Sequence, residues 1–189
     1  MKNIRIALIR HGRASAGWDT ALDPELDDLG RSQAESVAQK LETIFKDQSA
    51  EIISSPLLRC QQTAKAFALI RGAEVKVSHE VTEIPSPDGV TMNARIEWLR
   101  GAMQGNWSDL GANYLEFRDS TVKFIRAIDR NTVIFSHFIA INAIVGAIIG
   151  DDRLVIRKLD NCSITLLERD SLGTLHIAQD GHEADTLIR

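Results

Sequence analysis

The most constraining feature of the sequence is a pair of short apolar runs that each end in a histidine. Residues 4–9 are mostly apolar and rich in β-branched side chains, which predicts a buried strand, and Arg10 and His11 follow at once. Residues 132–137 repeat the arrangement, with His137 where the second apolar run stops. Because ligands bind at the carboxyl ends of strands in open α/β sheets, we expect both histidines at one site.

The rest of the chain alternates predicted helices with predicted strands. Apolar residues at helical spacing predict helices over residues 30–46, 57–70, 93–103, 114–128 and 139–149. Further strands are predicted over residues 51–54, 75–78, 163–168 and 174–179, the last two as a hairpin. Ser55 is expected to cap the second helix, with Pro56 in its first turn. This alternation predicts an α/β fold of three layers, α/β/α, with a mostly parallel central sheet and an antiparallel edge strand.

Length and composition predict one globular domain over residues 1–189. The chain is 44% hydrophobic and 25% charged, which is typical of a folded protein rather than a disordered one. Residues 80–111 carry the weakest pattern and several prolines and glycines, so we expect a variable lid or insertion there. The amino terminus lacks a signal region, and the apolar stretch 138–149 is too short to span a bilayer. We therefore expect a cytoplasmic protein with no membrane partner.

Charge narrows the class of ligand. The net charge of −4 provides no overall positive field, so no nucleic-acid partner is expected. Against this background Arg10, His11, Arg59 and His137 are predicted to meet at one sheet edge, which favours a multiply charged oxyanion such as phosphate. No Gly-rich phosphate loop with its Lys and no carboxylate cluster for Mg²⁺ is present, so no cofactor or metal is expected. Nothing in the sequence indicates an oligomeric state.

The sequence resembles the histidine phosphatase superfamily, which includes the cofactor-dependent phosphoglycerate mutases. The resemblance covers most of the chain outside residues 80–111, and its blocks follow one another in the order of the family. The matching blocks are Leu8-Ile9-Arg10-His11-Gly12, residues 24–34, residues 54–64, Ser136-His137 and Asn161-Cys162-Ser163-Ile164-Thr165. The resemblance implies a phosphoglycerate mutase-like fold and a phosphatase that needs no metal.

The resemblance also implies roles for individual residues. His11 is the expected nucleophile, which takes the phosphoryl group, while Arg10, Arg59 and His137 hold the phosphate oxygens. A carboxylate after the third strand is the expected proton donor, and Glu83 is the best positional match. Glu80, which is close by, and the more distant Asp88 are alternatives to Glu83.

The loop after the first strand and the second histidine carry further expectations. Ser15 is expected to offer the phosphate a hydrogen bond from this loop. The loop lacks the Asn and Thr of the mutases, which argues against mutase activity. Phe138 stands where family members commonly have Gly, and it is expected to narrow the pocket.

Two functions remain open on the sequence alone. The first is a phosphatase that hydrolyses phosphomonoesters through a phosphohistidine, with a small metabolite or a phosphoprotein as its substrate. The alternative is a binding or protein-interaction module without catalysis that keeps the phosphate pocket.

Overall fold

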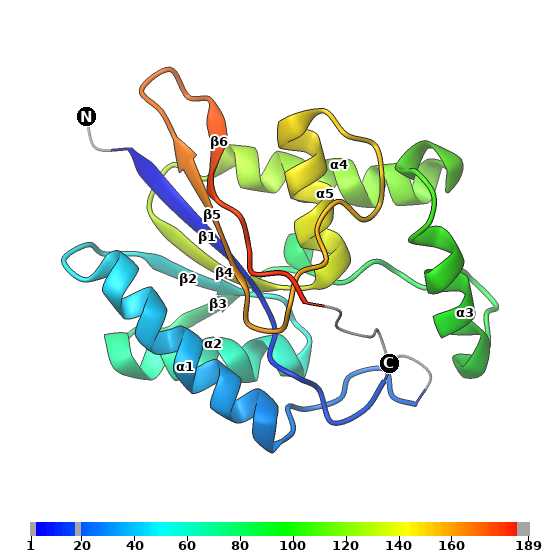
Figure 1. Cartoon of the computed structure of the whole chain (residues 1–189), viewed down its shortest axis with the longest axis horizontal. Coiled ribbons are helices and arrows are strands. Elements are labelled where there is room, and N and C mark those ends of the chain that lie inside the picture. The colour runs from blue at the N-terminus through cyan, green and yellow to red at the C-terminus, as the bar shows by residue number, and fades with distance from the viewer. Residues whose placement is uncertain (1–2, 18–19, 185–189) are drawn as a thin grey trace.

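The computed structural model describes residues 3–17 and 20–184, in which one mixed sheet has the strand order β3-β2-β4-β1-β5-β6. The strands are β1 (Ile4–Arg10), β2 (Glu51–Ser54), β3 (Val75–Val77), β4 (Thr132–Ser136), β5 (Ile164–Arg169) and β6 (Leu175–Gln179). The first four run parallel, and the hairpin of β5 and β6 adds the antiparallel edge (Figure 1). The predicted mostly parallel sheet is therefore confirmed.

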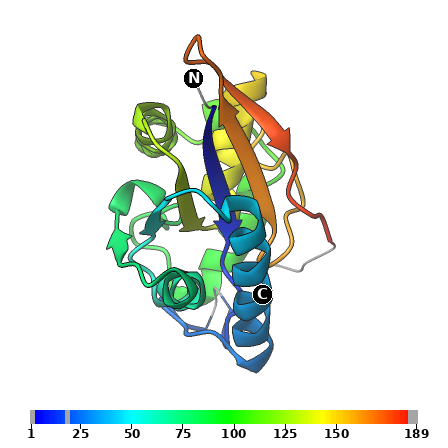
Figure 2. The same cartoon turned by 90° about the vertical axis from the view of Figure 1, so that its left-hand side faces the viewer.

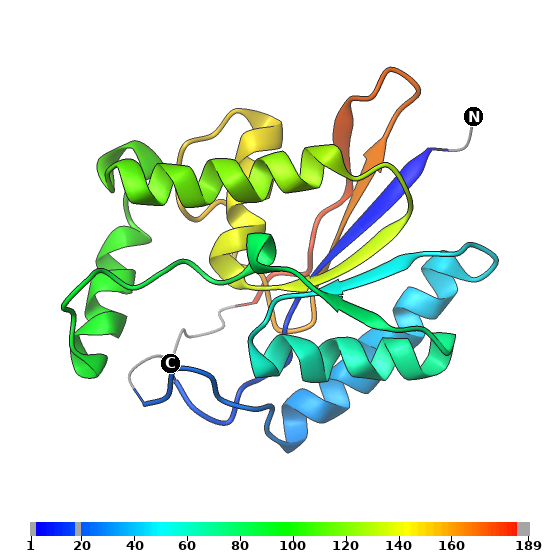
Figure 3. The ribbon, with the colours of Figure 1, turned by 180° about the vertical axis from the view of Figure 1, so that it is seen from behind.

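Helices cover both faces of this sheet. Helices α1 (Asp28–Phe45) and α2 (Leu58–Arg71) lie on one face, and α4 (Ala112–Ala127) and α5 (Phe138–Ile149) lie on the other (Figures 1 and 2). Helix α3 (Met92–Ala102) lies to one side of the sheet (Figure 3), between short 3₁₀ turns at His79–Val81 and Trp107–Asp109. The arrangement is the predicted three-layer fold.

The alternation of side chains along β1 divides the core into two halves. Ile6 and Leu8 pack in the apolar cluster that includes α5, whereas Ala7 and Ile9 pack in the cluster that includes α1 and α2. All four side chains are buried, because a central parallel strand has helices on both faces. The strand therefore ends at a fixed point between the two layers, and Arg10 stands at that point.

The helix starts differ from the predicted ones by one or two residues. Helix α1 begins at Asp28 because the carboxylate of Asp27 accepts the backbone N–H of Gly30 at 2.7 Å and caps the helix there. The prediction that Ser55 caps α2 is wrong, since Leu57 occupies the cap position. Helix α2 ends at Gly72, which adopts the left-handed conformation at φ 57° and caps the helix.

Neither cysteine forms a disulfide, since Cys60 and Cys162 are both free thiols. Within residues 3–17 and 20–184, no helix is long and apolar enough to cross a membrane. Trp18 and Asp19 of the loop that follows β1 lie outside the described residues.

The backbones of two glycines cross where the first loop meets α1. A Cβ atom on Gly12 would lie 2.6 Å from the carbonyl oxygen of Gly30, and one on Gly30 would lie 2.1 Å from the carbonyl oxygen of Arg13. Both positions are far inside van der Waals contact with backbone, so neither tolerates a side chain without a shift of the chain. This crossing places the residues after β1 against the start of α1.

We predict that Gly30→Ala lowers the free energy of unfolding by at least about 2 kcal/mol, because the backbone must move to admit a methyl group. Gly101→Ala is the matched control: a Cβ there meets nothing within 4 Å, and the substitution is expected to stabilise helix α3 by up to about 1 kcal/mol. Urea unfolding measures both. Equal effects of the two substitutions would contradict the close crossing.

Candidate active site

The first part of the site stands at the end of β1, where the chain leaves the sheet. The backbone N–H of His11 still donates to the carbonyl of Ser136 at 3.1 Å, so β4 fixes its position. On the other side, the Asn161 side-chain amide donates to the carbonyl of His11 at 2.9 Å. Sequence reasoning had included Asn161 in a matching block without assigning it this contact, because a bond across 150 residues leaves no periodic pattern.

The hydrogen bonds of His11 define its tautomer. Its Nδ1 lies 2.8 Å from the carbonyl oxygen of Gly12, and because a carbonyl can only accept, Nδ1 carries the proton. The other ring nitrogen, Nε2, accepts a hydrogen bond from Nε of Arg59 at 3.2 Å. A neutral imidazole with its lone pair on Nε2 therefore faces the guanidinium.

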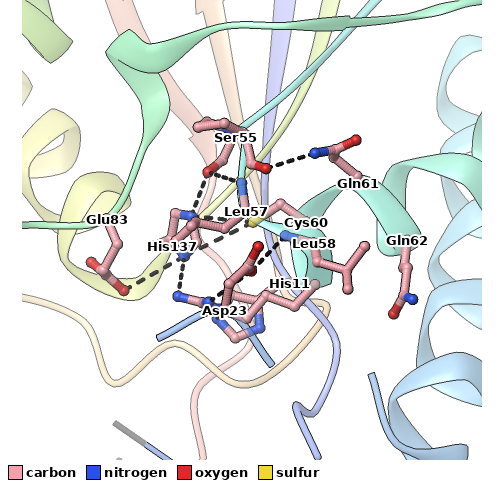
Figure 4. Close-up of polar contacts among 12 residues, drawn as sticks. His11, Asp23, Ser55, Leu57, Leu58, Cys60, Gln61, Gln62, Glu83 and His137 are labelled. Carbon is pink, nitrogen blue, oxygen red and sulfur yellow. Dashed lines mark hydrogen bonds and ion pairs between the residues drawn. The ribbon is translucent and has the colours of Figure 1, made fainter. Parts of the chain in front are cut away.

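Arg59 joins the two histidines. It lies in the first turn of α2, is 5% exposed, and places Nη2 at 3.2 Å from Nδ1 of His137. Its remaining nitrogen, Nη1, lies 3.8 Å from the carboxylate of Asp23. Asp23 also accepts the backbone N–H of Leu58 at 2.7 Å, so this loop residue holds the start of the helix that carries Arg59 (Figure 4).

His137 follows β4 and is fully buried. Its Nε2 lies 2.7 Å from the hydroxyl of Ser55 and 3.3 Å from the thiol of Cys60 (Figure 4). Because the guanidinium of Arg59 can only donate, Nδ1 accepts and Nε2 carries the proton toward Ser55. Ser55, which the sequence suggested as a helix cap, thus orients the second histidine. The two imidazole rings lie 5.3 Å apart, centre to centre.

Burial in positive surroundings keeps both histidines neutral. The pKa of His11 falls well below its ordinary value of 6.5, mainly through burial and further through Arg59 and Arg10. Burial and the same two arginines, together with His11, lower the pKa of His137 in the same direction. Both imidazoles are therefore neutral at physiological pH.

Arg10 provides a second buried guanidinium. Its Nη1 donates to the carbonyl of Leu159 at 2.5 Å, and the group lies over the Phe138 ring, 5.2 Å from the ring centre. Its Nε is buried and has no hydrogen-bond partner within the described residues. Burial lowers the pKa of Arg10 to about 10, although Glu83 and Asp160 act in the opposite direction.

Glu83 brings the predicted carboxylate to the same place. Its Oε2 lies 3.6 Å from Nδ1 of His137 and its Oε1 accepts the backbone N–H of Ile84 at 3.0 Å. The side chain is 10% exposed. Burial raises the pKa of Glu83 above its ordinary 4.5, against the opposing effects of Arg59 and the Ile84 N–H, so the carboxyl group retains its proton to higher pH.

The two alternative carboxylates lie elsewhere. Glu80 is exposed and accepts a hydrogen bond from the hydroxyl of Ser78, and this bond lowers its pKa. Asp88 is exposed and does not line the pocket that contains His11. Ser15 does line that pocket from the loop after β1, with an exposed side chain, and its backbone N–H donates to Glu25.

A cavity of about 1070 Å³ opens in front of these groups. Arg10, His11, Arg59 and Glu83 line its inner end, and Phe138 forms part of its wall. The space is far larger than one phosphate group and is at the upper end of the range for small-molecule sites. Within residues 3–17 and 20–184, no three His, Cys, Asp or Glu side chains are grouped to hold a metal ion.

Comparison with known proteins agrees with this geometry. The sequence profile of the histidine phosphatase superfamily (branch 1) matches residues 6–176. A glucosyl-3-phosphoglycerate phosphatase from Mycolicibacterium vanbaalenii is 26% identical over 193 residues, which cover 86% of this chain and 83% of that protein. A probable phosphoglycerate mutase from Photorhabdus laumondii is 25% identical over 189 residues, which cover 87% of this chain and 85% of that protein.

Solved structures share the fold. A mycobacterial glucosyl-3-phosphoglycerate phosphatase in complex with inorganic phosphate superposes with a TM-score of 0.75 at 22% identity, covering 95% of this chain and 98% of the other. A phosphoserine phosphatase from Entamoeba histolytica in complex with 3-phosphoglyceric acid gives a TM-score of 0.73 at 21% identity, covering 96% and 98%.

The protonation of Glu83 has a measurable consequence for stability. At pH values just above the ordinary pKa of 4.5, the native carboxyl keeps a proton that the unfolded chain releases, so Glu83 makes stability decrease as pH rises. We predict that Glu83→Gln steepens the rise of unfolding free energy with pH in this window, by up to about 1.4 kcal/mol per pH unit. Urea unfolding at several pH values measures the slope. An unchanged or flatter slope would mean that native Glu83 is ionised there.

Proposed function

Because the chain belongs to the histidine phosphatase superfamily, a family of phosphoric monoester hydrolases, we propose that it hydrolyses a phosphorylated small molecule through a phosphohistidine at His11. The observation that carries the proposal is the tautomer of His11. Nδ1 donates to Gly12, so the lone pair of Nε2 faces the inner end of the cavity beside Arg59. This lone pair accepts from Arg59 in the structure, and a neutral imidazole can attack phosphorus once that guanidinium turns its N–H to a phosphate oxygen.

In the first step, Nε2 of His11 forms a bond to phosphorus while the bond from phosphorus to the ester oxygen breaks. Glu83 gives its proton to the departing oxygen, and the raised pKa of Glu83 supports this role. In the second step, water attacks the phosphohistidine and gives a proton to Glu83, which restores both groups. The atoms balance because Glu83 takes back the proton that it gave. The arginines offset the negative charge of the phosphate, so these steps use no metal.

The phosphate needs a set of donors arranged around it. Arg10 and Arg59 supply two buried guanidiniums, and the buried Nε of Arg10 has no partner within the described residues, so a phosphate oxygen would satisfy it. His137 is proposed to hold a further oxygen through Nδ1, which faces Arg59 and Glu83, and this role needs the ring proton to move from Nε2 to Nδ1 when the phosphate enters. Ser15, at the mouth of the pocket, is proposed to donate a hydrogen bond to the substrate.

A small phosphorylated molecule is favoured over a phosphoprotein by two observations. The mycobacterial relative is named for a small sugar acid phosphate, and the cavity is large enough to take such a molecule. Residues 80–111, which contain α3, are proposed to be the variable part of a single domain and to set which molecule fits.

We predict that His11→Ala lowers turnover of an aryl phosphate by at least about 10³-fold, because the nucleophile is lost. Assays include a chelator, and alkaline-quenched wild-type protein is expected to carry a phosphoryl group that the variant lacks. His176→Ala, at an exposed histidine outside the pocket, is the control and is expected to keep full activity. Wild-type turnover in the His11 variant, or loss of activity on chelation, would contradict the mechanism. Phosphate binding without turnover in the wild type would favour the non-catalytic alternative.

A second prediction tests Glu83. An alkyl phosphate has a poor leaving group that needs a proton, so Glu83→Gln is expected to slow its hydrolysis by about 10²-fold or more. An aryl phosphate leaves with little help, and its hydrolysis is expected to slow by less than about tenfold. Glu80→Gln is the control, because Glu80 is exposed and outside the pocket. Equal losses for the two esters would remove Glu83 from the role of acid.

A further inference from the structure

The pocket has a charge opposite to that of the whole protein. The chain has a net charge of −4, yet among the described residues five arginines and three carboxylates line this cavity. Arg13 and Asp27 offset each other, because the Asp27 carboxylate lies 2.6 Å from Nε of Arg13, which leaves four of these arginines against Glu83 and Asp160. Glu83 tends to keep its proton. The cavity therefore holds more positive charge than one phosphate at His11 needs.

Part of this positive charge comes from helix α3. Arg95 and Arg100 both line the cavity, together with Ile96 and Leu99. Residues 95 and 99, like residues 96 and 100, are four positions apart, so all four lie on one face of the helix, and this face borders the cavity. Nε of Arg95 donates to the Ser86 hydroxyl at 2.7 Å, which holds its guanidinium along the wall.

Arg95 lies within electrostatic range of the phosphate end of the cavity. Its pKa is lowered, first by burial and then by the positive charge of Arg59, while Glu83 raises it. Arg95 in turn acts to lower the pKa of Glu83. The cavity, at about 1070 Å³, is large enough for a small substrate that contacts both His11 and α3.

We propose that α3 forms a second anion subsite, in which Arg95 and Arg100 bind a carboxylate or a second phosphate of the same molecule whose phosphate lies at His11. The substrate class is thus a phosphomonoester that carries another anionic group, and Ile96 and Leu99 contact the carbon skeleton between the two. Guanidinium groups suit this task because they bind carboxylate and phosphate through paired hydrogen bonds. This inference depends on the proposed function only in placing the phosphate of the substrate at His11.

The test compares matched esters. 4-Carboxyphenyl phosphate and its neutral carbamoyl analogue differ in one charge, and phosphoglycolate and its amide repeat the comparison with a shorter spacer. The ratio of kcat/KM for the acid to that for the amide is measured in each protein, so effects common to both esters cancel. We expect Arg95→Gln and Arg100→Gln each to lower this ratio by about tenfold for at least one spacer.

The control removes an arginine elsewhere. Arg126 is exposed near the end of α4 and does not line the cavity, so Arg126→Gln is expected to leave the ratio unchanged. Ratios that stay at the wild-type value in both α3 variants for both spacers would overturn the proposal. An ester with a second phosphate in place of the carboxylate shows which of the two anions the subsite prefers.

A binding measurement separates this inference from the proposed reaction. Calorimetry with the His11→Ala protein compares the affinities of the acid and the amide without any turnover. Tighter binding of the acid, lost on adding Arg95→Gln, supports the subsite even if the wild type hydrolyses neither ester, in which case only the proposed reaction fails. Equal affinities for acid and amide would count against the subsite whatever the wild type hydrolyses.

Discussion

The site depends on one buried cation placed between two imidazoles. Arg59 donates to Nε2 of His11 and lies equally close, at 3.2 Å, to Nδ1 of His137. Burial, and after it a guanidinium at that distance, makes a charged histidine unfavourable, so both rings are neutral and turn a lone pair toward Arg59. Nε2 of His11 thus carries a lone pair without a neighbouring base to remove a proton, which is what its proposed role as nucleophile requires. In the proposed reaction, the negative charge of the substrate phosphate would balance the positive charges of Arg59 and Arg10.

The short distances between Arg59 and the two histidines are fixed by hydrogen bonds that join backbone segments from distant parts of the chain. The pairing of Arg10 with Ser136 aligns the ends of β1 and β4, and so sets the positions of the two histidines. The Gly12 N–H donates to the Thr63 hydroxyl at 3.0 Å, and Asp23 accepts the first N–H of α2. These bonds join the loop after β1 to the helix that carries Arg59. The fold therefore fixes the relative positions of three short segments, which are the end of β1 with the loop after it, the end of β4 and the start of α2.

The sequence predicted the features that follow from hydrophobic periodicity and from the order of helices and strands. It missed the features that depend on contacts between residues far apart in the chain. Strand β2 lies where the apolar pattern placed it, and the strand ends brought His11 and His137 together because parallel strands share an edge. Ser55 was misassigned as a helix cap, since its contact with His137 spans 82 residues. The arginines of α3 carried no signal, because nothing local shows which face of a helix borders a cavity.

Phe138 shows how a departure from a family pattern gains a physical meaning in the folded chain. Glycine is common after the second histidine, and the aromatic ring was expected to narrow the pocket. The ring does line the cavity, but it also lies against the guanidinium of Arg10, 5.2 Å from its centre, with only 7% of Phe138 exposed. An aromatic face stabilises a cation that has lost its water, which a glycine cannot do. Phe138 thus helps to exclude solvent from Arg10 and to hold the charged guanidinium of Arg10 at the inner end of the cavity.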